Sequence, residues 1–208
     1  MLHLENKFWS QGYRRVLGMD EVGRGALAGP VTVGGVIWRV SLSFQWREGV
    51  TDGGIRDSKA LTPPARERLA RFIMAEAEAY AISSRDQSHI DEFGIVHAVQ
   101  SCQHEIVAKL APDVLLLDAF ALPNCNPTIV QQAIVRGDQL SLSIAAASII
   151  AKVARDRYMC ELDPQYPGLG LKTHKGYGTK GHYAALAVFG PCDLHRRTFL
   201  RGWDRSRV

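Results

Sequence analysis

The apolar run Val114-Leu115-Leu116-Leu117, which ends in Asp118, constrains the fold more than any other feature of this sequence. A short, continuous apolar run of this kind is typical of a strand buried on both faces, and such strands occur in sheets that helices cover on both sides. The run therefore predicts a central strand that delivers a carboxylate at its carboxyl end.

Hydrophobic periodicity predicts the elements around this strand. Val16–Met19 forms a strand that runs into Asp20, and residues 31–38 form a second strand that pairs with it antiparallel. The remaining predicted elements are a helix from Thr62 to about Tyr80, a short strand over 81–83, and helices over 95–110, from Ile144 to about Leu162, over 182–189 and after Asp193.

The helix that begins at Ile144 has two different sides. Its Ala145-Ala146-Ala147 run would allow a close approach to the sheet, while Lys152, Arg155 and Arg157 are placed on its polar side. Strands that come first and then alternate with helices predict an α/β fold, a mixed sheet flanked by helices with a small helical C-terminal extension. We expect a core over 1–162 and a C-terminal loop with helices over 163–208.

Length and composition fit a soluble globular protein of one domain. The chain has 208 residues, of which 46% are hydrophobic and 22% charged. Its scattered cysteines form no Cys-x-x-Cys pair, which argues against a zinc knuckle or a disulfide framework. Neither a leader pattern over 1–7 nor a membrane-length apolar stretch is present, so we expect a cytoplasmic protein without membrane contact. The absence of a sustained heptad predicts a monomer.

The charge distribution is compatible with a polyanionic partner. The formal net charge is +4 and the sequence pI is near 9.0. Cations crowd residues 172–182 and 195–207, and both stretches contain aromatic side chains that could stack on nucleotides or sugars. Simple solubility is the alternative interpretation of both clusters.

Apolar runs deliver carboxylates at three places, namely Asp20, Asp118 and, after Ile134, Asp138. Carboxylates at neighbouring strand ends converge, although a single strand-terminal aspartate more often forms a turn or a cap. Glu21 can join this group only if its strand has already broken into the turn, because successive side chains of a strand point to opposite faces.

The glycine-flanked arginine after these acids completes the chemical pattern. Carboxylates can hold a divalent metal, and the backbone amides and side chain of Gly23-Arg24-Gly25 can hold phosphate. Together these residues predict a site that hydrolyses nucleic acid. The alternative is a pair of solvated acids followed by an ordinary glycine turn.

These residues and several further motifs occur in the order found in bacterial ribonuclease HII, and the chain resembles that family from about residue 13 to 200. Two departures are a somewhat long stretch over 40–54 and Arg136 at a position where lysine is frequent. The motifs that carry the resemblance are Asp20-Glu21-Val22-Gly23-Arg24-Gly25, Asp57-Ser58-Lys59, Asp118, Gly137-Asp138, residues 144–153, His174-Lys175-Gly176-Tyr177-Gly178-Thr179 and His195-Arg196-Arg197-Thr198-Phe199.

The resemblance implies a ribonuclease H-like fold and endonucleolytic cleavage of RNA in RNA–DNA hybrids. It also implies nicking on the 5′ side of single ribonucleotides embedded in duplex DNA, with 5′-phosphate and 3′-hydroxyl ends. Asp20, Glu21, Asp118 and Asp138 would be the catalytic acids and would bind Mg²⁺ or Mn²⁺ in a two-metal displacement. Mutual repulsion of these carboxylates also favours bound cations.

The resemblance implies substrate contacts as well. The Gly23-Arg24-Gly25 backbone would contact the ribonucleotide, and Tyr177 would pack on the adjacent sugar and hydrogen-bond its 2′-hydroxyl. Lys59 would grip phosphate, and Ser148 and Thr173 are further phosphate-contact candidates. The alternatives are a loop anchor for Tyr177, a solvated lysine, and local capping by the two hydroxyls.

Other functions stay open on sequence grounds. The chain could be a ribonuclease H-like nuclease or strand transferase without ribose selectivity, or a non-catalytic nucleic-acid-binding module. The histidines lack the spacing and cysteine partners of a zinc site, and His195 is expected to be structural. A replication or repair partner, recruited through residues 201–208, is also open.

Overall fold

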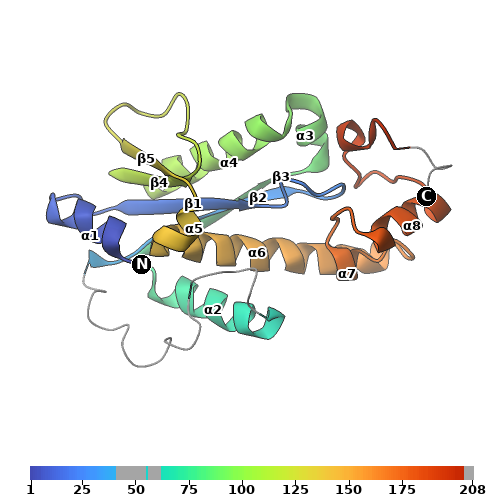
Figure 1. The fold of residues 1–208 in the computed structure, drawn as a ribbon, viewed down its shortest axis with the longest axis horizontal. Coiled ribbons are helices and arrows are strands. Elements are labelled where there is room, and N and C mark those ends of the chain that lie inside the picture. Colours follow the sequence, from blue (N-terminus) through green and yellow to red (C-terminus); the bar gives the residue numbers. More distant parts are fainter. Residues whose placement is uncertain (41–54, 56–61, 204–208) are drawn as a thin grey trace.

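In the computed structural model of this chain, residues 1–40, 55 and 62–203 are described, and they surround a five-stranded sheet of order β3-β2-β1-β4-β5 (Figure 1). Strand β1 pairs antiparallel with β2 and parallel with β4, so the sheet is mixed, as predicted. The strands are β1 (Val16–Val22), β2 (Val31–Ile37), β3 (Ala79–Arg85), β4 (Val114–Asp118) and β5 (Val130–Ile134).

Helices cover both faces of this sheet (Figure 1). One face carries α3 (Gln87–Phe93) and α4 (Ile95–Leu110), and the other carries α6 (Leu142–Leu162) with α2 (Pro63–Glu76) outside it. The smaller helices are α1 (His3–Ser10), α5 (Gly137–Leu140), η3 (Asp163–Gln165), α7 (Leu171–His174), α8 (Lys180–Phe189) and η4 (Arg197–Leu200). Among the described residues, no helix combines the length and apolarity that a membrane crossing requires.

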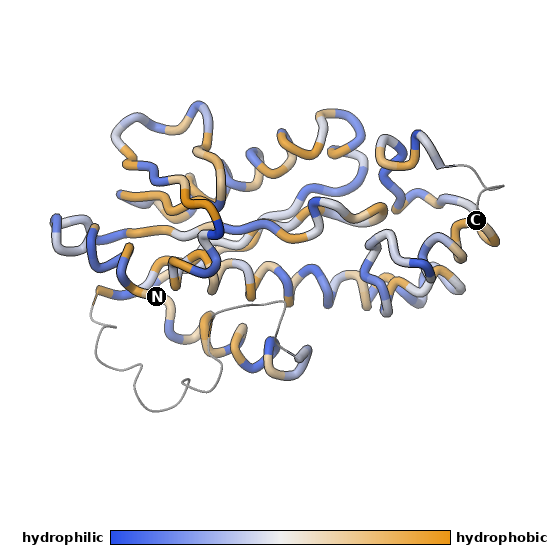
Figure 2. Tube along the Cα trace, in the orientation of Figure 1, coloured by the Kyte–Doolittle hydropathy of each residue, from blue (hydrophilic) through white to orange (hydrophobic). Residues whose placement is uncertain are grey.

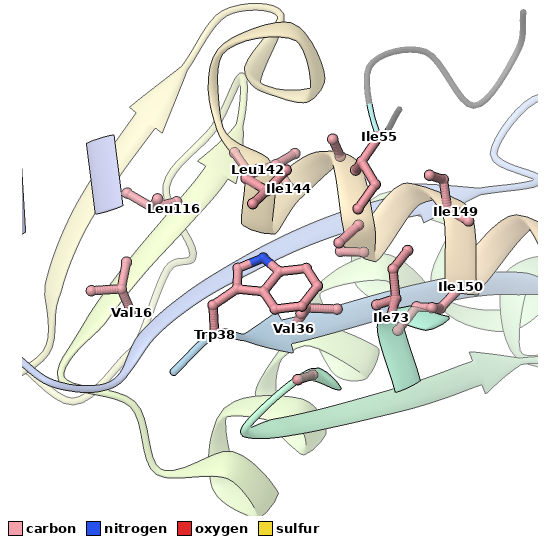
Figure 3. Packing of buried hydrophobic residues seen from close by; sticks show 14 of the residues in the cluster. Val16, Val36, Trp38, Ile55, Ile73, Leu116, Leu142, Ile144, Ile149 and Ile150 are labelled. Carbon is pink, nitrogen blue, oxygen red and sulfur yellow. The ribbon is translucent and has the colours of Figure 1, made fainter. Parts of the chain in front are cut away.

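Alternation along the strands sorts the core into two layers. Figure 2 shows hydrophobic residues concentrated along the central strands. Leu17, Met19 and Leu117 belong to the layer under α4, whereas Val16 and Leu116 belong to the layer under α6, part of which Figure 3 shows. By the same alternation, Asp20 and Asp118 continue the α6 face, and Glu21 continues the α4 face.

Helix α6 lies unusually close to the sheet. A Cβ atom added at Gly18 would stand 2.4 Å from the Ile144 nitrogen, and one at Gly34 would stand 2.4 Å from the Ala147 carbonyl oxygen. Small residues on both sides are therefore required at this contact. The close approach predicted from the Ala145–Ala147 run is confirmed.

Several predicted element bounds were wrong. Helix α2 ends at Glu76 rather than near Tyr80, because residues 79–85 instead pair with β2 along its whole length. Helices α1 and α3 were not predicted. In α1, the buried Glu5 carboxylate accepts hydrogen bonds from the Ser141 hydroxyl and the Ser143 amide, at 2.6 and 2.9 Å, a contact between distant segments that hydrophobic periodicity does not reveal.

The chain after β5 also differs from the prediction. The expected strand ending at Asp138 was wrong, since β5 stops at Ile134 and Arg136 takes a left-handed conformation with φ of 58°. Asp138 therefore lies on the short helix α5. The division into a core over 1–162 and a C-terminal part over 163–208 stays a prediction, although Leu162 is the last residue of α6.

Candidate active site

Two predicted acids lie side by side at the ends of parallel strands. Met19 of β1 is in register with Leu117 of β4, so Asp20 and Asp118 follow at the same level of the sheet and on the same face. Each of these side chains is partly exposed. The convergence expected from the sequence is therefore confirmed for this pair.

Glu21 reaches the same sheet edge from the other face. The expectation that its strand must break first was wrong, because β1 continues to Val22 and pairs Glu21 with Val33 of β2. The Glu21 carboxylate accepts a hydrogen bond from the Arg24 guanidinium at 3.1 Å. Asp20 and Glu21 thus lie on opposite faces of β1, close to its carboxyl end.

Asp118 is fixed by the turn that follows β5. Its Oδ1 accepts a hydrogen bond from the Gly137 amide at 2.9 Å. Asp138, the next residue, is partly exposed at the start of α5, so it follows the backbone amide that binds Asp118 and does not lie at a strand end.

Asp20 is the most strongly perturbed carboxyl group of the site. Burial raises its pKa to about 7, a hydrogen bond from Ser148 opposes this change, and the nearby charges of Glu21 and Asp118 raise the pKa further. The ionised form is therefore disfavoured unless a positive charge approaches, which is the electrostatic condition for binding a cation.

The donor set suits a hard divalent cation that also binds a phosphate. Asp20, Glu21 and Asp118 offer only carboxylate oxygens, which Mg²⁺ and Mn²⁺ accept. In the part of the chain that the structure describes, no group of three or more His, Cys, Asp or Glu side chains is arranged so that it could hold a metal ion by itself. Mg²⁺ commonly uses one or two carboxylates together with water and substrate phosphate, so an open set of acids fits it.

A cavity of about 470 Å³ opens beside these acids. It lies between the acid edge of the sheet and helix α4, and Phe120 at its rim is 72% exposed. The lining residues are Glu21, Arg24, Val96, Val99, Gln100, Gln103, Asp118, Phe120, Ala121 and Pro123.

Two buried arginines hold the loop that connects β1 to β2. Arg155 donates to the carbonyls of Pro30, Ala28 and Lys175, at 2.8, 3.2 and 2.9 Å. Its placement on the polar side of the helix was wrong, since it is 1% exposed and faces the loop. Burial lowers the pKa of Arg155, and the carbonyl dipoles compensate its charge.

Arg196 holds the same loop from the C-terminal segment. Its guanidinium donates to the carbonyls of Gly23, Arg24 and Gly29, at 2.7, 2.9 and 3.0 Å. Burial and the neighbouring charge of Arg155 lower its pKa to about 9, so it stays charged at neutral pH. The sequence marks Arg196 only as one cation of a basic tail, and no periodic signal distinguishes a buried arginine from a solvated one.

The two glycines around Arg24 have different surroundings. Gly23 has a φ of 86°, and a Cβ atom there would stand 2.2 Å from Nε of Arg155. At Gly25 a Cβ atom would meet nothing within 4 Å. Gly23 therefore makes room for the arginine below it, and only Gly25 leaves space toward solvent.

Tyr177 is brought to this loop from far along the chain. Its hydroxyl accepts a hydrogen bond from the Gly23 amide at 3.1 Å. Lys152 and Arg155 place cationic groups 5.3 and 5.2 Å from the centre of its ring. The aromatic ring is thus fixed within a positively charged wall next to the acids.

The remaining candidates for phosphate contacts differ in their position relative to the acids. Ser148 is partly exposed on α6 and hydrogen-bonds Asp20, which makes it a neighbour of the acid cluster. Thr173 is exposed on α7. Lys59 lies outside the described residues.

Three buried histidines lie behind Tyr177. His174 and His182 stack at 4.0 Å between ring centres, and Nε2 of His182 lies 3.1 Å from Nε2 of His195. Burial and the proximity of His174 and His195 lower the pKa of His182 to about 4. His195 is buried within this network, in agreement with the structural role expected for it.

Acidification should destabilise the protein through His182. A base whose folded pKa lies below its unfolded value of about 6.5 stabilises the fold fully above that value, and the contribution is lost as the pH falls toward 4. We expect the free energy of unfolding to fall by about 2–3 kcal/mol between pH 7 and pH 4.5 from this group. Urea unfolding at both pH values measures this fall. The free energy of unfolding of His182→Asn, which lacks the imidazole, should fall by less. An equal loss in both proteins would contradict the assignment.

The fold and the site together define a class of protein. A mixed sheet covered on both faces, with carboxylates at the ends of adjacent parallel strands, is the ribonuclease H-like fold. The ribonuclease HII of the PCNA:RNase HII complex from Archaeoglobus fulgidus is similar, with a TM-score of 0.73 and 25% identity over 93% of this chain and 100% of that chain. Ribonuclease H2 from Pyrococcus horikoshii OT3 is also similar, with a TM-score of 0.66 and 26% sequence identity. The match covers 93% of this chain and 95% of that chain.

Sequence comparisons identify the family. The family model described as Ribonuclease HII matches residues 17–202. The ribonuclease HII of Caldicellulosiruptor bescii is 42% identical over 95% of this chain and 92% of its own, and that of Nitrosococcus oceani is 46% identical over 89% of each. The chain belongs to the ribonuclease HII family, whose members are hydrolytic ribonucleases H.

Proposed function

We propose that this protein cleaves the RNA strand of RNA–DNA hybrids and nicks duplex DNA on the 5′ side of single embedded ribonucleotides. The observation that carries the proposal is that the acid cluster lies next to the contact between Gly23 and Tyr177. Asp20 and Glu21 lie near the end of β1, and Asp118 ends the adjacent strand β4. The loop that follows β1 holds the Gly23 amide, which meets the Tyr177 hydroxyl.

The acids would hold the divalent metal. Asp20 and Asp118 face one side of the sheet edge and Glu21 the other, and Asp138 follows the amide that orients Asp118. Bound Mg²⁺ or Mn²⁺ would supply Lewis-acid stabilisation of phosphate charge and lower the pKa of bound water. Hydrolysis on the side that leaves 5′-phosphate and 3′-hydroxyl ends is part of the proposal.

The Gly23 amide and the Tyr177 hydroxyl would recognise the 2′-hydroxyl of the ribose. The amide and hydroxyl already share a hydrogen bond of 3.1 Å, so both have the geometry to exchange partners with a 2′-hydroxyl. Gly25 leaves open space for the sugar to approach the backbone, as no atom lies within 4 Å of its missing Cβ. The tyrosine ring can pack on the sugar of the neighbouring nucleotide.

Phosphate contacts would come from the cations around this pair. Arg24 is bonded to Glu21 but half exposed, and Lys152 lies over the Tyr177 ring. Lys59 and Thr173 stay candidates for this role. For Ser148 the observed bond to Asp20 favours orienting that carboxylate over gripping phosphate.

A duplex with one ribonucleotide tests the proposal directly. With Mg²⁺ or Mn²⁺ present, we expect one nick on the 5′ side of the ribonucleotide and none in the matched all-DNA duplex. Mapping of the product ends should give 5′-phosphate and 3′-hydroxyl groups, and chelation of the metal should stop the reaction. Equal cleavage of both duplexes would defeat the ribose-sensing proposal and favour a nuclease or strand transferase without ribose selectivity.

The partner and the location of this protein are also proposals. The Archaeoglobus fulgidus protein was solved in complex with PCNA, and we propose a replication partner of that type for this chain. We propose a cytoplasmic monomer that acts on nucleic acid, in keeping with its net charge of +4.

A further inference from the structure

The segment that carries Tyr177 is not fixed by its own sequence. Glycines flank the tyrosine on both sides, and Gly176 has a φ of 83°. Glycine adopts many backbone conformations at little cost, so this segment needs tethers if the tyrosine hydroxyl is to stay at one place. The Gly176 carbonyl provides one tether, because it accepts hydrogen bonds from the amides of Leu27 and Ala28 at 2.8 and 3.2 Å.

A second tether runs through the buried histidines, and its hydrogen bonds close for only one set of tautomers. The Cys192 amide donates to Nδ1 of His195 at 3.0 Å, so the proton of neutral His195 is on Nε2. That nitrogen lies 3.1 Å from Nε2 of His182, which must accept. Nδ1 of His182 then carries the proton and donates to the Tyr177 carbonyl at 3.0 Å.

His174 secures the same segment from the other side. Its Nδ1 accepts from the Gly176 amide at 3.1 Å, and its Nε2 donates to the Leu169 carbonyl at 2.6 Å. Its ring stacks on that of His182, with planes 10° apart. Each ring nitrogen of the three histidines thus has a partner, and none of the three faces the acid cluster as a ligand.

We propose that His182, oriented by His195, is a positioning residue for Tyr177. Its Nδ1–H fixes the Tyr177 carbonyl, and through it the hydroxyl that meets the Gly23 amide. The inference rests on the ribose-sensing role proposed for Tyr177. Because recognition of a single hydroxyl depends on hydrogen-bond geometry, release of this carbonyl should weaken recognition without removing any group that touches the substrate.

Nitrogen NMR of the free protein tests the tautomers without any substrate. In protein labelled with ¹⁵N, ring-nitrogen shifts near pH 7 should show His182 protonated at Nδ1, and His174 and His195 protonated at Nε2. A charged His182, or a His182 protonated at Nε2, would overturn the proposal.

A pair of variants at one position separates positioning from packing. In His182→Asn the side-chain amide stands where Nδ1 stood and can still donate to the Tyr177 carbonyl, whereas His182→Phe keeps the ring but has no donor. Both variants leave His195 without its acceptor, so both should be less stable than the wild type. At a temperature where both are folded, we expect kcat/KM on the one-ribonucleotide duplex to fall about five- to tenfold in His182→Phe and to stay within about twofold in His182→Asn.

The Gly23 amide gives the deciding readout. Its NMR resonance should shift in His182→Phe in the direction seen in Tyr177→Phe and stay near its original position in His182→Asn. Equal kcat/KM in the two variants, or an unmoved Gly23 resonance in His182→Phe, would show a merely structural role. If instead the wild type cleaves the all-DNA duplex equally well, the proposed ribose sensing fails while the tautomers and the Gly23 resonance still test the tether.

Discussion

Asp118→Asn is expected to abolish most cleavage while leaving the fold intact. The asparagine oxygen can still accept from the Gly137 amide, so the turn before α5 should keep its geometry. What is lost is one carboxylate charge at the proposed metal site, and several kcal/mol of transition-state stabilisation correspond to about a 100- to 1,000-fold lower rate. Single-turnover cleavage of the one-ribonucleotide duplex measures the rate, and a gel-shift assay measures binding.

Matched variants sharpen this result. Asp20→Asn should have the same effect, because Asp20 and Asp118 end adjacent strands on one face of the sheet. Glu76→Gln removes an equal charge at the exposed end of α2 and should cleave normally. Undiminished cleavage by both aspartate variants would contradict the catalytic role of these acids, whereas a wild type that binds the duplex without cleaving it would support a nucleic-acid-binding module whose acids are structural.

Arg196→Met should cause the largest loss of stability among single substitutions near the site. The guanidinium is fully buried and donates to three carbonyls of the loop between β1 and β2. Methionine would leave the Arg24 and Gly29 carbonyls without this donor, and the Gly23 carbonyl would keep only the Ala26 amide at 3.2 Å. Unsatisfied buried acceptors cost about 1–3 kcal/mol each, so we expect a loss of about 3–5 kcal/mol in the free energy of unfolding. Urea unfolding followed by tryptophan fluorescence measures the loss.

The neighbouring residue provides the control for this substitution. Arg197 is exposed, and Asp91 accepts from its backbone amide, which Arg197→Met retains. Arg196→Lys keeps the charge but cannot present the planar set of donors, so it should be nearly as destabilised as Arg196→Met. Substitutions of exposed residues usually change the free energy of unfolding by no more than about 0.5 kcal/mol. A difference of less than about 1 kcal/mol in this free energy between Arg196→Met and Arg197→Met would therefore contradict the role of Arg196 in holding the loop.

Hydrophobic periodicity predicted the elements whose own side chains decide their structure. The run ending at Asp118 became a central strand, and the helix over 95–110 has the predicted bounds. The helix expected to reach Tyr80 was too long, since pairing with β2 begins at Ala79. That pairing depends on a partner more than 40 residues away, which local propensity does not include.

The acids show the same division. Asp20 and Asp118 could be placed together from sequence because both end strands whose burial is evident. Asp138 follows a left-handed turn at Arg136 and the Gly137 amide that binds Asp118. Glu21 lies within a strand that was expected to break before it. Turn geometry and strand extent depend on hydrogen bonds to other segments, so neither was predictable.

The order of motifs and the pattern of apolar residues were enough to predict the family and the sheet, and they selected the candidate acids. Only the tertiary structure decided that Arg155 and Arg196 lie buried under a loop, and that three histidines hold the segment of Tyr177. The physical reason is that a charged or titratable residue reads the same in the sequence whether the fold exposes it to solvent or buries it in the core. Its role is set by the carbonyls, amides and rings that the fold brings within bonding distance.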